Sequence, residues 1–251
     1  MKISEDQIGR SIELESPPRR IVSLVPSQTE FLLDIGAPVV GRTSYCIHPA
    51  SMAEEIPIVG GTKNFRIDKI QELAPDLIVG NKEENSKSGI QKLMTQFPTW
   101  ISDVKTLHGA FDMMQTLGEV CEYQKESQRI IADCREALHK VKATQQGSAI
   151  YMIWKDPWMA AGKGTFIDEI MQHLGYRNAV KEERYPQISS EVLQDLDVDH
   201  VLLSSEPFPF EKRHSEEMRN LKPHSQISIV DGELFSWYGS RLRKWYDYAT
   251  S

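Results

Sequence analysis

One serine in this chain could act as a nucleophile. Ser27 lies in the segment PSQTE, directly after an apolar run. Nucleophilic catalysis would need a histidine and a carboxylate converging on the hydroxyl, and PSQTE lacks the glycines of a nucleophile elbow. Ser27 and Glu30 instead have the spacing of a capping box, in which each side chain satisfies a backbone N–H group at a helix start. We therefore predict a helix start, with Gly36 at its C-terminal cap, and no catalytic residue. Ser27 would still lie at the carboxyl end of a strand, where open α/β sheets bind ligands.

The segment AAGKGTF, residues 160–166, could be a phosphate-binding loop. The Walker pattern needs a glycine five residues before Gly162, and Pro157 occupies that position. A turn in front of a helix is the better interpretation.

Histidine and cysteine are too scattered to predict a metal centre. The seven histidines have no H-x-x-x-H or H-E-x-x-H spacing, and the three cysteines have no C-x-x-C spacing. Cys46 and His48, in YCIHP, are the one close pair. We predict no metal site made by the protein alone, no intrinsic cofactor and free thiols of a reducing compartment.

Aromatic residues occur where apolar runs give way to loops. Tyr45 follows PVVGR, Trp154 and Trp158 end or follow SAIYMIW, and Phe235 and Trp237 follow QISIVD. Any one ring could be ordinary core. A flat ligand would nevertheless be held mainly by such rings, because covering one is worth roughly 1.5 to 3 kcal/mol.

The elements that would position these residues follow an α/β pattern. Short apolar runs alternate with segments of helical period, and the runs are RIVSLV, DLIVGN, TWISDV, SAIYMIW, DHVLLSS and QISIVD. DKIQELAPDLIV, residues 68–79, aligns without a gap on EVLQDLDVDHVL, residues 191–202. RIVSLV with its following helix likewise recurs as AIYMIW with FIDEIMQHLG. These repeats favour two similar lobes.

A long helix is predicted between the repeats. Residues 122–144 contain neither proline nor glycine, and Ile130, Cys134 and Leu138 fall on one stripe. We predict an α/β fold of two Rossmann-like lobes with central, mostly parallel sheets, joined by one long connector helix. The expected segments are an N-terminal lobe (1–106), a helical segment (107–146) and a C-terminal lobe (147–251).

Composition excludes several classes of function. A net charge of -7 offers no basic face for nucleic acid, and no run reaches the roughly 18 apolar residues of a membrane span. The N-terminal MKISEDQIGRSIELE lacks the apolar region of a secretory signal, which predicts a cytoplasmic protein, or a periplasmic one if a signal segment has been removed. We predict a C-terminal helix, docked on the second lobe, in the segment SWYGSRLRKWYDYAT, with Leu242, Trp245 and Tyr246 on one face.

The motifs resemble those of a known family. RIVSLVPSQTEFLLDIGAPVVGRTSYCIHP, followed by IPIVGGTKNFRIDKIQELAPDLIVGN, is similar to the N-terminal lobe of helical-backbone (class III) substrate-binding proteins. Those proteins serve ABC importers of cobalamin, haem and ferric siderophores. The resemblance extends over residues 19–81, 147–205 and the segment LFSWYGSRL.

The resemblance implies a non-catalytic protein that binds a small chelate, namely a corrinoid, haem or ferric siderophore, in a cleft between two lobes. It implies an ABC permease or another protein as partner, with no nucleic acid and no membrane insertion. The residues we expect to bind ligand are Ser27, Tyr45, Trp154, Trp158, Phe235 and Trp237. Asp68 and Glu191 match the positions where the family carries an acidic residue on each lobe for permease docking, although the macrodipole alone favours acids at helix starts. The alternative function is a cytoplasmic enzyme, or a regulatory or scaffold module, that kept the fold and lost transport.

Overall fold

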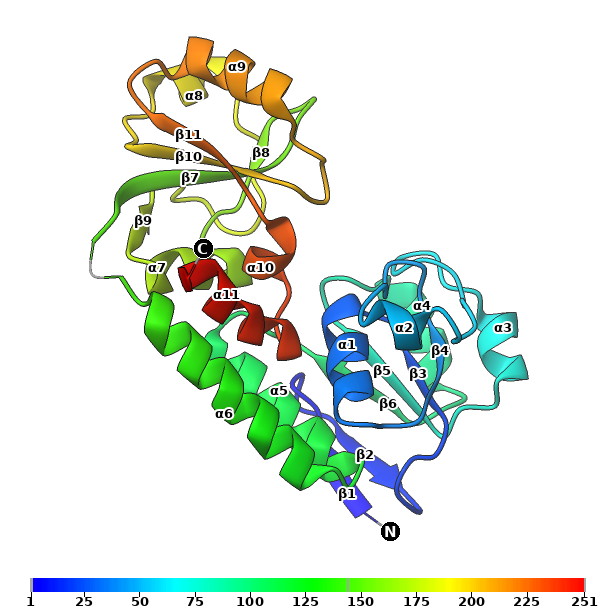
Figure 1. Ribbon diagram of the computed structural model, residues 1–251. Helices are drawn as coiled ribbons and strands as arrows, with labels where there is room; N and C mark the ends of the chain where they lie inside the picture. The colour runs from blue at the N-terminus through cyan, green and yellow to red at the C-terminus, as the bar shows by residue number, and fades with distance from the viewer. Residues whose placement is uncertain (1, 144, 251) are drawn as a thin grey trace. The chain divides into compact units, whose positions relative to one another are not determined.

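The structure is a computed structural model that describes residues 2–143 and 145–250. The chain forms two compact units, whose elements are labelled in Figure 1. Unit 1 contains the residues up to Val104, His108–Ala137 and Trp237–Arg243. Unit 2 contains Lys105–Leu107, Leu138–Ser236 and the residues from Lys244 on.

Unit 1 is built on a four-stranded parallel sheet in the order β4-β3-β5-β6. Its strands are β3 (Ile21–Ser23), β4 (Val39–Arg42), β5 (Leu77–Asn81) and β6 (Thr99–Ser102). The helices between and beside them are α1 (Pro26–Asp34), α2 (Ala50–Ala53), α3 (Ile67–Glu72) and α4 (Lys87–Met94). A separate antiparallel pair is formed by β1 (Lys2–Glu5) and β2 (Ser11–Leu14). Strands β3 and β5 are buried along their whole length, which explains why their sequences are continuous apolar runs.

Unit 2 has a mostly parallel sheet in the order β11-β10-β7-β8, with β9 also paired to β7. Its strands are β7 (Gly147–Trp154), β8 (Met159–Ala160), β9 (Tyr176–Asn178), β10 (His200–Ser204) and β11 (Gln226–Val230). Only β8 is antiparallel to its neighbour. Its helices are α7 (Phe166–His173), α8 (Ser190–Asp195), α9 (Lys212–Leu221), α10 (Gly232–Ser236) and α11 (Trp245–Thr250).

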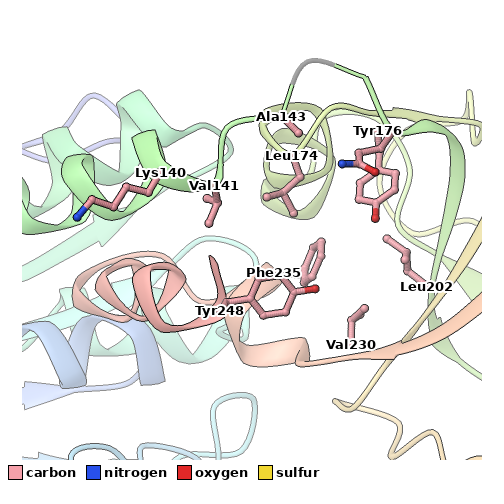
Figure 2. A pocket seen from close by; sticks show the side chains of 10 residues that line it. Lys140, Val141, Ala143, Leu174, Tyr176, Leu202, Val230, Phe235 and Tyr248 are labelled. Carbon is pink, nitrogen blue, oxygen red and sulfur yellow. The ribbon is translucent and has the colours of Figure 1, made fainter. Parts of the chain in front are cut away.

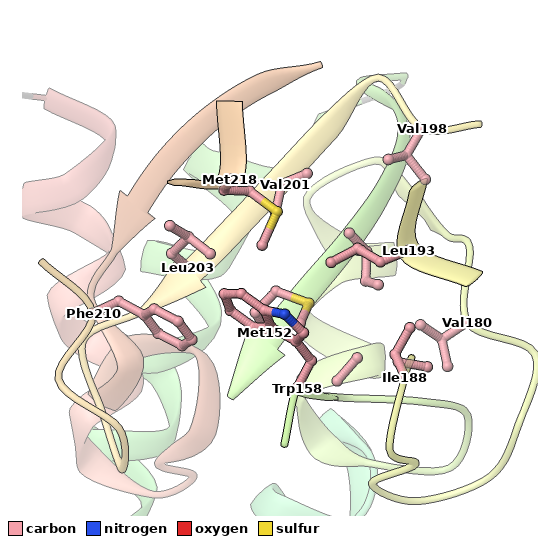
Figure 3. Close-up of a cluster of buried hydrophobic side chains, with 12 residues drawn as sticks. Met152, Trp158, Val180, Ile188, Leu193, Val198, Val201, Leu203, Phe210 and Met218 are labelled. Atoms are coloured by element: carbon pink, nitrogen blue, oxygen red, sulfur yellow. The ribbon is translucent and has the colours of Figure 1, made fainter. Parts of the chain in front are cut away.

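The main core of unit 2 lies between its sheet and the helices α8 and α9. Val201 and Leu203 point from β10 into this cluster, where they meet Leu193 of α8 and Met218 of α9 (Figure 3). Because side chains alternate along a strand, Leu202 points to the opposite face of the sheet. That face is used by the cavity described below.

The predicted α/β class and the six predicted strands are confirmed. Both halves also contain the predicted succession of an acidic-led helix and a strand, α3 with β5 and α8 with β10. The predicted long helix is α6 (Gln124–Val141), which follows α5 (Leu107–Val120), and the division between the two units falls inside α6. Within unit 1, α6 packs on α5, since the Ser127 hydroxyl donates a hydrogen bond to the Met114 carbonyl at 2.8 Å.

The predicted capping box at the start of α1 is wrong. The helix begins at Pro26, whose fixed φ and missing N–H group suit the first helical position, and the N-cap residue is Val25. Ser27 and Glu30 therefore lie inside the helix, where they are 3% and 5% exposed. Gly36 ends the helix as predicted, with a φ of +83°.

The C-terminal segment is not one helix. Residues Ser240–Lys244 form a 3-10 turn and α11 begins at Trp245. Residues 237–243 belong to unit 1, although the sequence places them in the C-terminal lobe, and only α11 lies in unit 2. The physical cause is a set of polar contacts to unit 1, including the ion pair of Arg243 with Asp34 at 2.6 Å.

No helix within the described ranges 2–143 and 145–250 is long and apolar enough to cross a membrane.

Candidate functional site

A polar network lies where the parallel strands of unit 1 end. The Asn81 amide, at the end of β5, donates hydrogen bonds to the Ser102 hydroxyl at 2.9 Å and to the Tyr238 hydroxyl at 2.8 Å. The Tyr238 hydroxyl donates in turn to Glu84 at 3.2 Å. Burial and the nearby Glu84 carboxylate raise the pKa of Tyr238 well above its ordinary value, so it stays a hydrogen-bond donor. The network fastens the 237–243 segment to this edge of the sheet.

The loop after β4 presents apolar side chains at the same edge. Cys46 anchors it from below, because its sulfur hydrogen-bonds with Thr29 at 3.0 Å and Thr43 at 3.1 Å. On either side of this anchor, Tyr45 is 62% exposed and Ile47 is 48% exposed. Large apolar side chains so exposed on a firmly held loop are suited to cover a ligand.

Trp237 joins this loop from the far end of the chain. Its ring packs edge-on against His48, with 5.5 Å between the ring centroids. The Arg241 guanidinium lies 4.9 Å from the Trp237 ring centroid and donates to Glu30 at 2.9 Å. We call Tyr45, Ile47, His48 and Trp237 the unit 1 edge surface.

Unit 2 has an aromatic cluster where β7 and β10 end. Trp154, the last residue of β7, is 40% exposed and packs edge-on against Phe208 at 5.6 Å. Phe208 packs on Phe210 at 4.7 Å, and Phe210 is stacked on Trp158 with an interplanar angle of 2°. Trp158 and Phe210 are buried and belong to the core of this unit. We call Trp154, Trp158, Phe208 and Phe210 the unit 2 aromatic cluster.

The six residues expected to bind ligand are therefore in different environments. Tyr45 and Trp154 are exposed, whereas the other four are buried, with exposures of 3% for Ser27, 8% for Trp158, 1% for Phe235 and 8% for Trp237. Phe235 lies inside unit 2, where its ring contacts Tyr151 at 5.0 Å and Trp245 at 5.3 Å.

Sequence reasoning did not identify three residues that contact the expected ligand-binding residues, namely Phe208, Phe210 and Arg241. Phe208 and Phe210 alternate with prolines in SEPFPFEK, directly after a predicted strand, and this position could have identified them. For Arg241 no local signal exists, because its partner Glu30 is 211 positions away.

The segment AAGKGTF is the predicted turn in front of a helix. Thr165 is the N-cap residue of α7, since its hydroxyl oxygen accepts a hydrogen bond from the Asp168 N–H group at 3.1 Å. The Lys163 amino group, which would reach for phosphate in a nucleotide-binding loop, is paired with Asp168 at 3.1 Å.

Cys46 is buried, and the His48 ring packs against Trp237. Burial raises the pKa of the Cys46 thiol, which disfavours the thiolate that a metal needs. Over residues 2–143 and 145–250, no group of three or more histidine, cysteine or acidic side chains could hold a metal ion. The three cysteines are free and buried.

Asp68 and Glu191 are exposed in the first turns of α3 and α8. Asp68 is paired with Arg66 at 2.5 Å, and this hydrogen bond lowers its pKa. Backbone N–H donation, followed by a hydrogen bond from Ser189, lowers the pKa of Glu191. Both carboxylates are therefore charged at neutral pH.

Known proteins resemble this chain in sequence and in fold. The chain is 24% identical over 255 residues to the uncharacterized ABC transporter substrate-binding lipoprotein YvrC of Bacillus subtilis, and the match covers 95% of this chain and 81% of YvrC. The structure of the periplasmic vitamin B12 binding protein BtuF of Vibrio cholerae matches with a TM-score of 0.77 and 22% identity, over 93% of this chain and 95% of BtuF. The periplasmic catecholate-siderophore binding protein VctP of Vibrio cholerae matches with a TM-score of 0.80 and 15% identity, over 99% and 98% of the two chains. These two likenesses show the same two-lobed α/β fold.

The family assignment rests on the sequence. Residues 21–223 match the profile of a family described as periplasmic binding protein. That family and the lipoprotein YvrC give no support to the cytoplasmic location expected from the sequence. Because the family match spans most of the chain, this protein belongs to the periplasmic binding protein family of ABC-transporter substrate-binding proteins.

Proposed function

We propose that this chain binds a small chelate-type ligand, a corrinoid, haem or ferric siderophore, without chemically changing it. The observation that carries the proposal is the exposure of Tyr45 and Trp154, each at the carboxyl end of a parallel strand and each on an anchored segment. Open α/β sheets bind their ligands at this end of the strands. The ligands of BtuF and VctP, a corrinoid and a catecholate siderophore by their names, support the same class.

In this proposal Tyr45 and Trp154 touch the ligand directly. Trp237 and Trp158 do not contact the ligand in this proposal but pack against His48 and Phe210, respectively. Ser27 and Phe235 are buried and contribute to the packing of unit 1 and unit 2. The side chains that contact a flat chelate would be apolar rings. A corrinoid would need no protein ligand, because the corrin supplies the chelation itself.

Titration with cyanocobalamin, haemin and ferrichrome, followed by intrinsic fluorescence, tests this function. At least one chelate should bind saturably, and Tyr45→Ala and Trp154→Ala should each raise its Kd about tenfold, since the ring of each contributes roughly 1 to 2 kcal/mol when covered. Tyr246→Ala is the matched control, because Tyr246 is also exposed, at 44%, but lies on α11. Absence of saturable binding for all three chelates would refute the ligand class.

Absence of catalysis is tested on the same samples. After prolonged incubation at neutral pH, mass spectrometry should recover the bound chelate with unchanged mass. A modified product that accumulates with protein concentration would instead make the chain an enzyme.

We also propose that Asp68 and Glu191 dock an ABC permease outside the cytoplasm. Asp68→Asn and Glu191→Gln should reduce the ATPase stimulation of the importer for the bound chelate, while ligand affinity stays constant. Glu72→Gln is the matched control, because Glu72 is an exposed acid at the other end of α3. Equal stimulation by all variants would remove these residues from the docking surface, and recovery of the native protein solely in the cytoplasmic fraction would refute the location.

A further inference from the structure

Unit 2 contains a cavity of about 350 Å³ on the face of its sheet that Leu202 points to. Its apolar wall is formed by Leu174, Leu202, Val230 and Phe235 (Figure 2). These residues come from the end of α7, from β10, from β11 and from α10. The cavity is therefore a product of tertiary packing and lies apart from the unit 2 aromatic cluster.

The apolar wall is built before any ligand arrives. Leu202 is 3% exposed, Val230 7% and Phe235 1%. Contacts with Tyr151 and Trp245 fix the Phe235 ring from behind. A preformed wall lowers the entropic cost of binding, because few side chains need to be ordered.

Two tyrosines supply the polar part of the lining. Tyr176 begins β9 and Tyr248 lies on α11, and Figure 2 shows both hydroxyls next to the apolar wall. Burial, with the nearby Tyr248, raises the pKa of Tyr176, so its hydroxyl is a donor at neutral pH. The cavity thus offers hydrogen-bond donors to an acceptor group.

A lysine belongs to the lining of the cavity. Lys140 lies in the last turn of α6, and its side chain points away from the apolar wall (Figure 2). Its amino group lies 3.8 Å from the Tyr246 ring centroid. Among the lining residues in the described part of the chain, Lys140 is the one with a formal charge. A cationic side chain in the lining is more compatible with an anionic head group than with a cationic one.

We propose that this cavity is a second binding site, for a small amphiphile with an apolar body and a carboxylate head. The body lies against Leu202, Val230 and Phe235, and the carboxylate accepts hydrogen bonds from Tyr176 and Tyr248. A cavity of about 350 Å³ is near the lower end of the range for small-molecule sites, which roughly spans 300 to 1,000 Å³, so the ligand is smaller than a metal chelate of the first site.

Decanoate is the probe for this site, in calorimetric titration and thermal unfolding of the full chain. We expect saturable binding of one decanoate, with weaker binding of decanol and none of decyltrimethylammonium. Tyr176→Phe should raise the decanoate Kd about fivefold. Lys140→Gln should raise the decanoate Kd about twofold, whereas Lys140→Arg should keep the wild-type Kd. Lys142→Gln is the matched control and should leave the Kd unchanged, because Lys142 is exposed and is not a lining residue of the cavity.

Filling the cavity is the second test. Val230→Phe should abolish decanoate binding, because the added ring occupies the cavity. Ile229→Phe is the matched control, since Ile229 is the preceding residue of β11 and is 44% exposed. Tyr45→Ala should leave decanoate binding intact, so the outcome is independent of the chelate site. No saturable decanoate binding, equal binding by wild type, Tyr176→Phe and Val230→Phe, or loss of binding in Tyr45→Ala would overturn the proposal.

Discussion

Removing one partner of the buried ion pair between Glu30 and Arg241 should strongly destabilise unit 1. The guanidinium and the carboxylate are 2.9 Å apart, and their side chains are 3% exposed for Arg241 and 7% for Glu30. Glu30→Gln keeps the shape of the side chain but removes its charge. The buried guanidinium would then lose the charge of Glu30, and the contact that holds residues 237–243 to α1 would weaken.

The magnitude follows from the burial of both groups. Removing one partner of a buried pair costs about 3 to 5 kcal/mol, because the remaining charge stays desolvated without compensation. A total free energy of unfolding is about 5 to 15 kcal/mol, so this single change would remove a large part of it. Replacing both partners by apolar residues is often nearly neutral. The double variant Glu30→Leu/Arg241→Met should therefore lose less free energy of unfolding than Glu30→Leu and Arg241→Met lose in sum. We expect a difference of at least about 2 kcal/mol.

Urea unfolding, followed by far-UV circular dichroism and tryptophan fluorescence, measures these differences. The pair of Arg66 and Asp68 is the matched control, because the two groups are 2.5 Å apart but both side chains are 58% exposed. Solvent screens that pair, so Asp68→Asn should leave the urea midpoint nearly unchanged. Two results would refute this reasoning about burial. Either Glu30→Gln lowers the urea midpoint no more than Asp68→Asn does, or the free-energy losses of the two single variants add up to the loss in the double variant.

Three further predictions concern the backbone, pH and thiol chemistry. Gly60→Ala should lower the free energy of unfolding by about 1 to 3 kcal/mol, because the φ of Gly60 is +119° and an added Cβ would lie 2.6 Å from a backbone carbonyl oxygen. Gly61→Ala is the control in urea unfolding and should be neutral, because its Cβ would meet no atom closer than 3.6 Å. Hydrogen bonds from Ser148 lower the pKa of Asp199 below its ordinary value of 3.8. The stability lost in Asp199→Asn should therefore be constant near neutral pH and should decrease as the pH falls from 3.8 through the lowered pKa, and a difference that stays constant as the pH falls below 3.8 would contradict this. Burial raises the pKa of the Cys134 thiol to about 12, so iodoacetamide at pH 8 should alkylate it only after unfolding, and rapid labelling of the folded protein by mass spectrometry would show that the thiol is accessible.

Hydrophobic patterning along the sequence was sufficient to predict most of the fold. The runs that became β3, β5, β7 and β10 are apolar because both faces of a parallel sheet are covered, and α6 shows its buried stripe through Ile130, Cys134 and Leu138. These are local properties, since each depends on residues a few positions apart. The motif series was equally local, and it indicated the family that the match over residues 21–223 confirms.

The candidate site was predictable only in part. Tyr45 and Trp154 could be found because Tyr45 follows β4 and Trp154 ends β7, and an aromatic residue at the end of a strand is a local signal. Their exposure could not be found, because Trp158 and Trp237 have similar sequence contexts and are buried. Whether a ring faces solvent or core depends on neighbours such as Phe210 that come from another part of the chain.

The order of strands and helices, the long helix α6 and the family could therefore be predicted from the sequence, because hydrophobic periodicity and motifs are contained in short stretches. The role of Glu30 depends on the folded chain, since the PSQTE motif suggested a helix cap and Glu30 instead pairs with Arg241, 211 positions later. The same holds for the cavity of unit 2, whose wall combines residues from four separate elements. The physical reason is that the free energy of a buried charge or of an unfilled space depends on all the groups that surround it, and those groups are brought together only when the chain has folded.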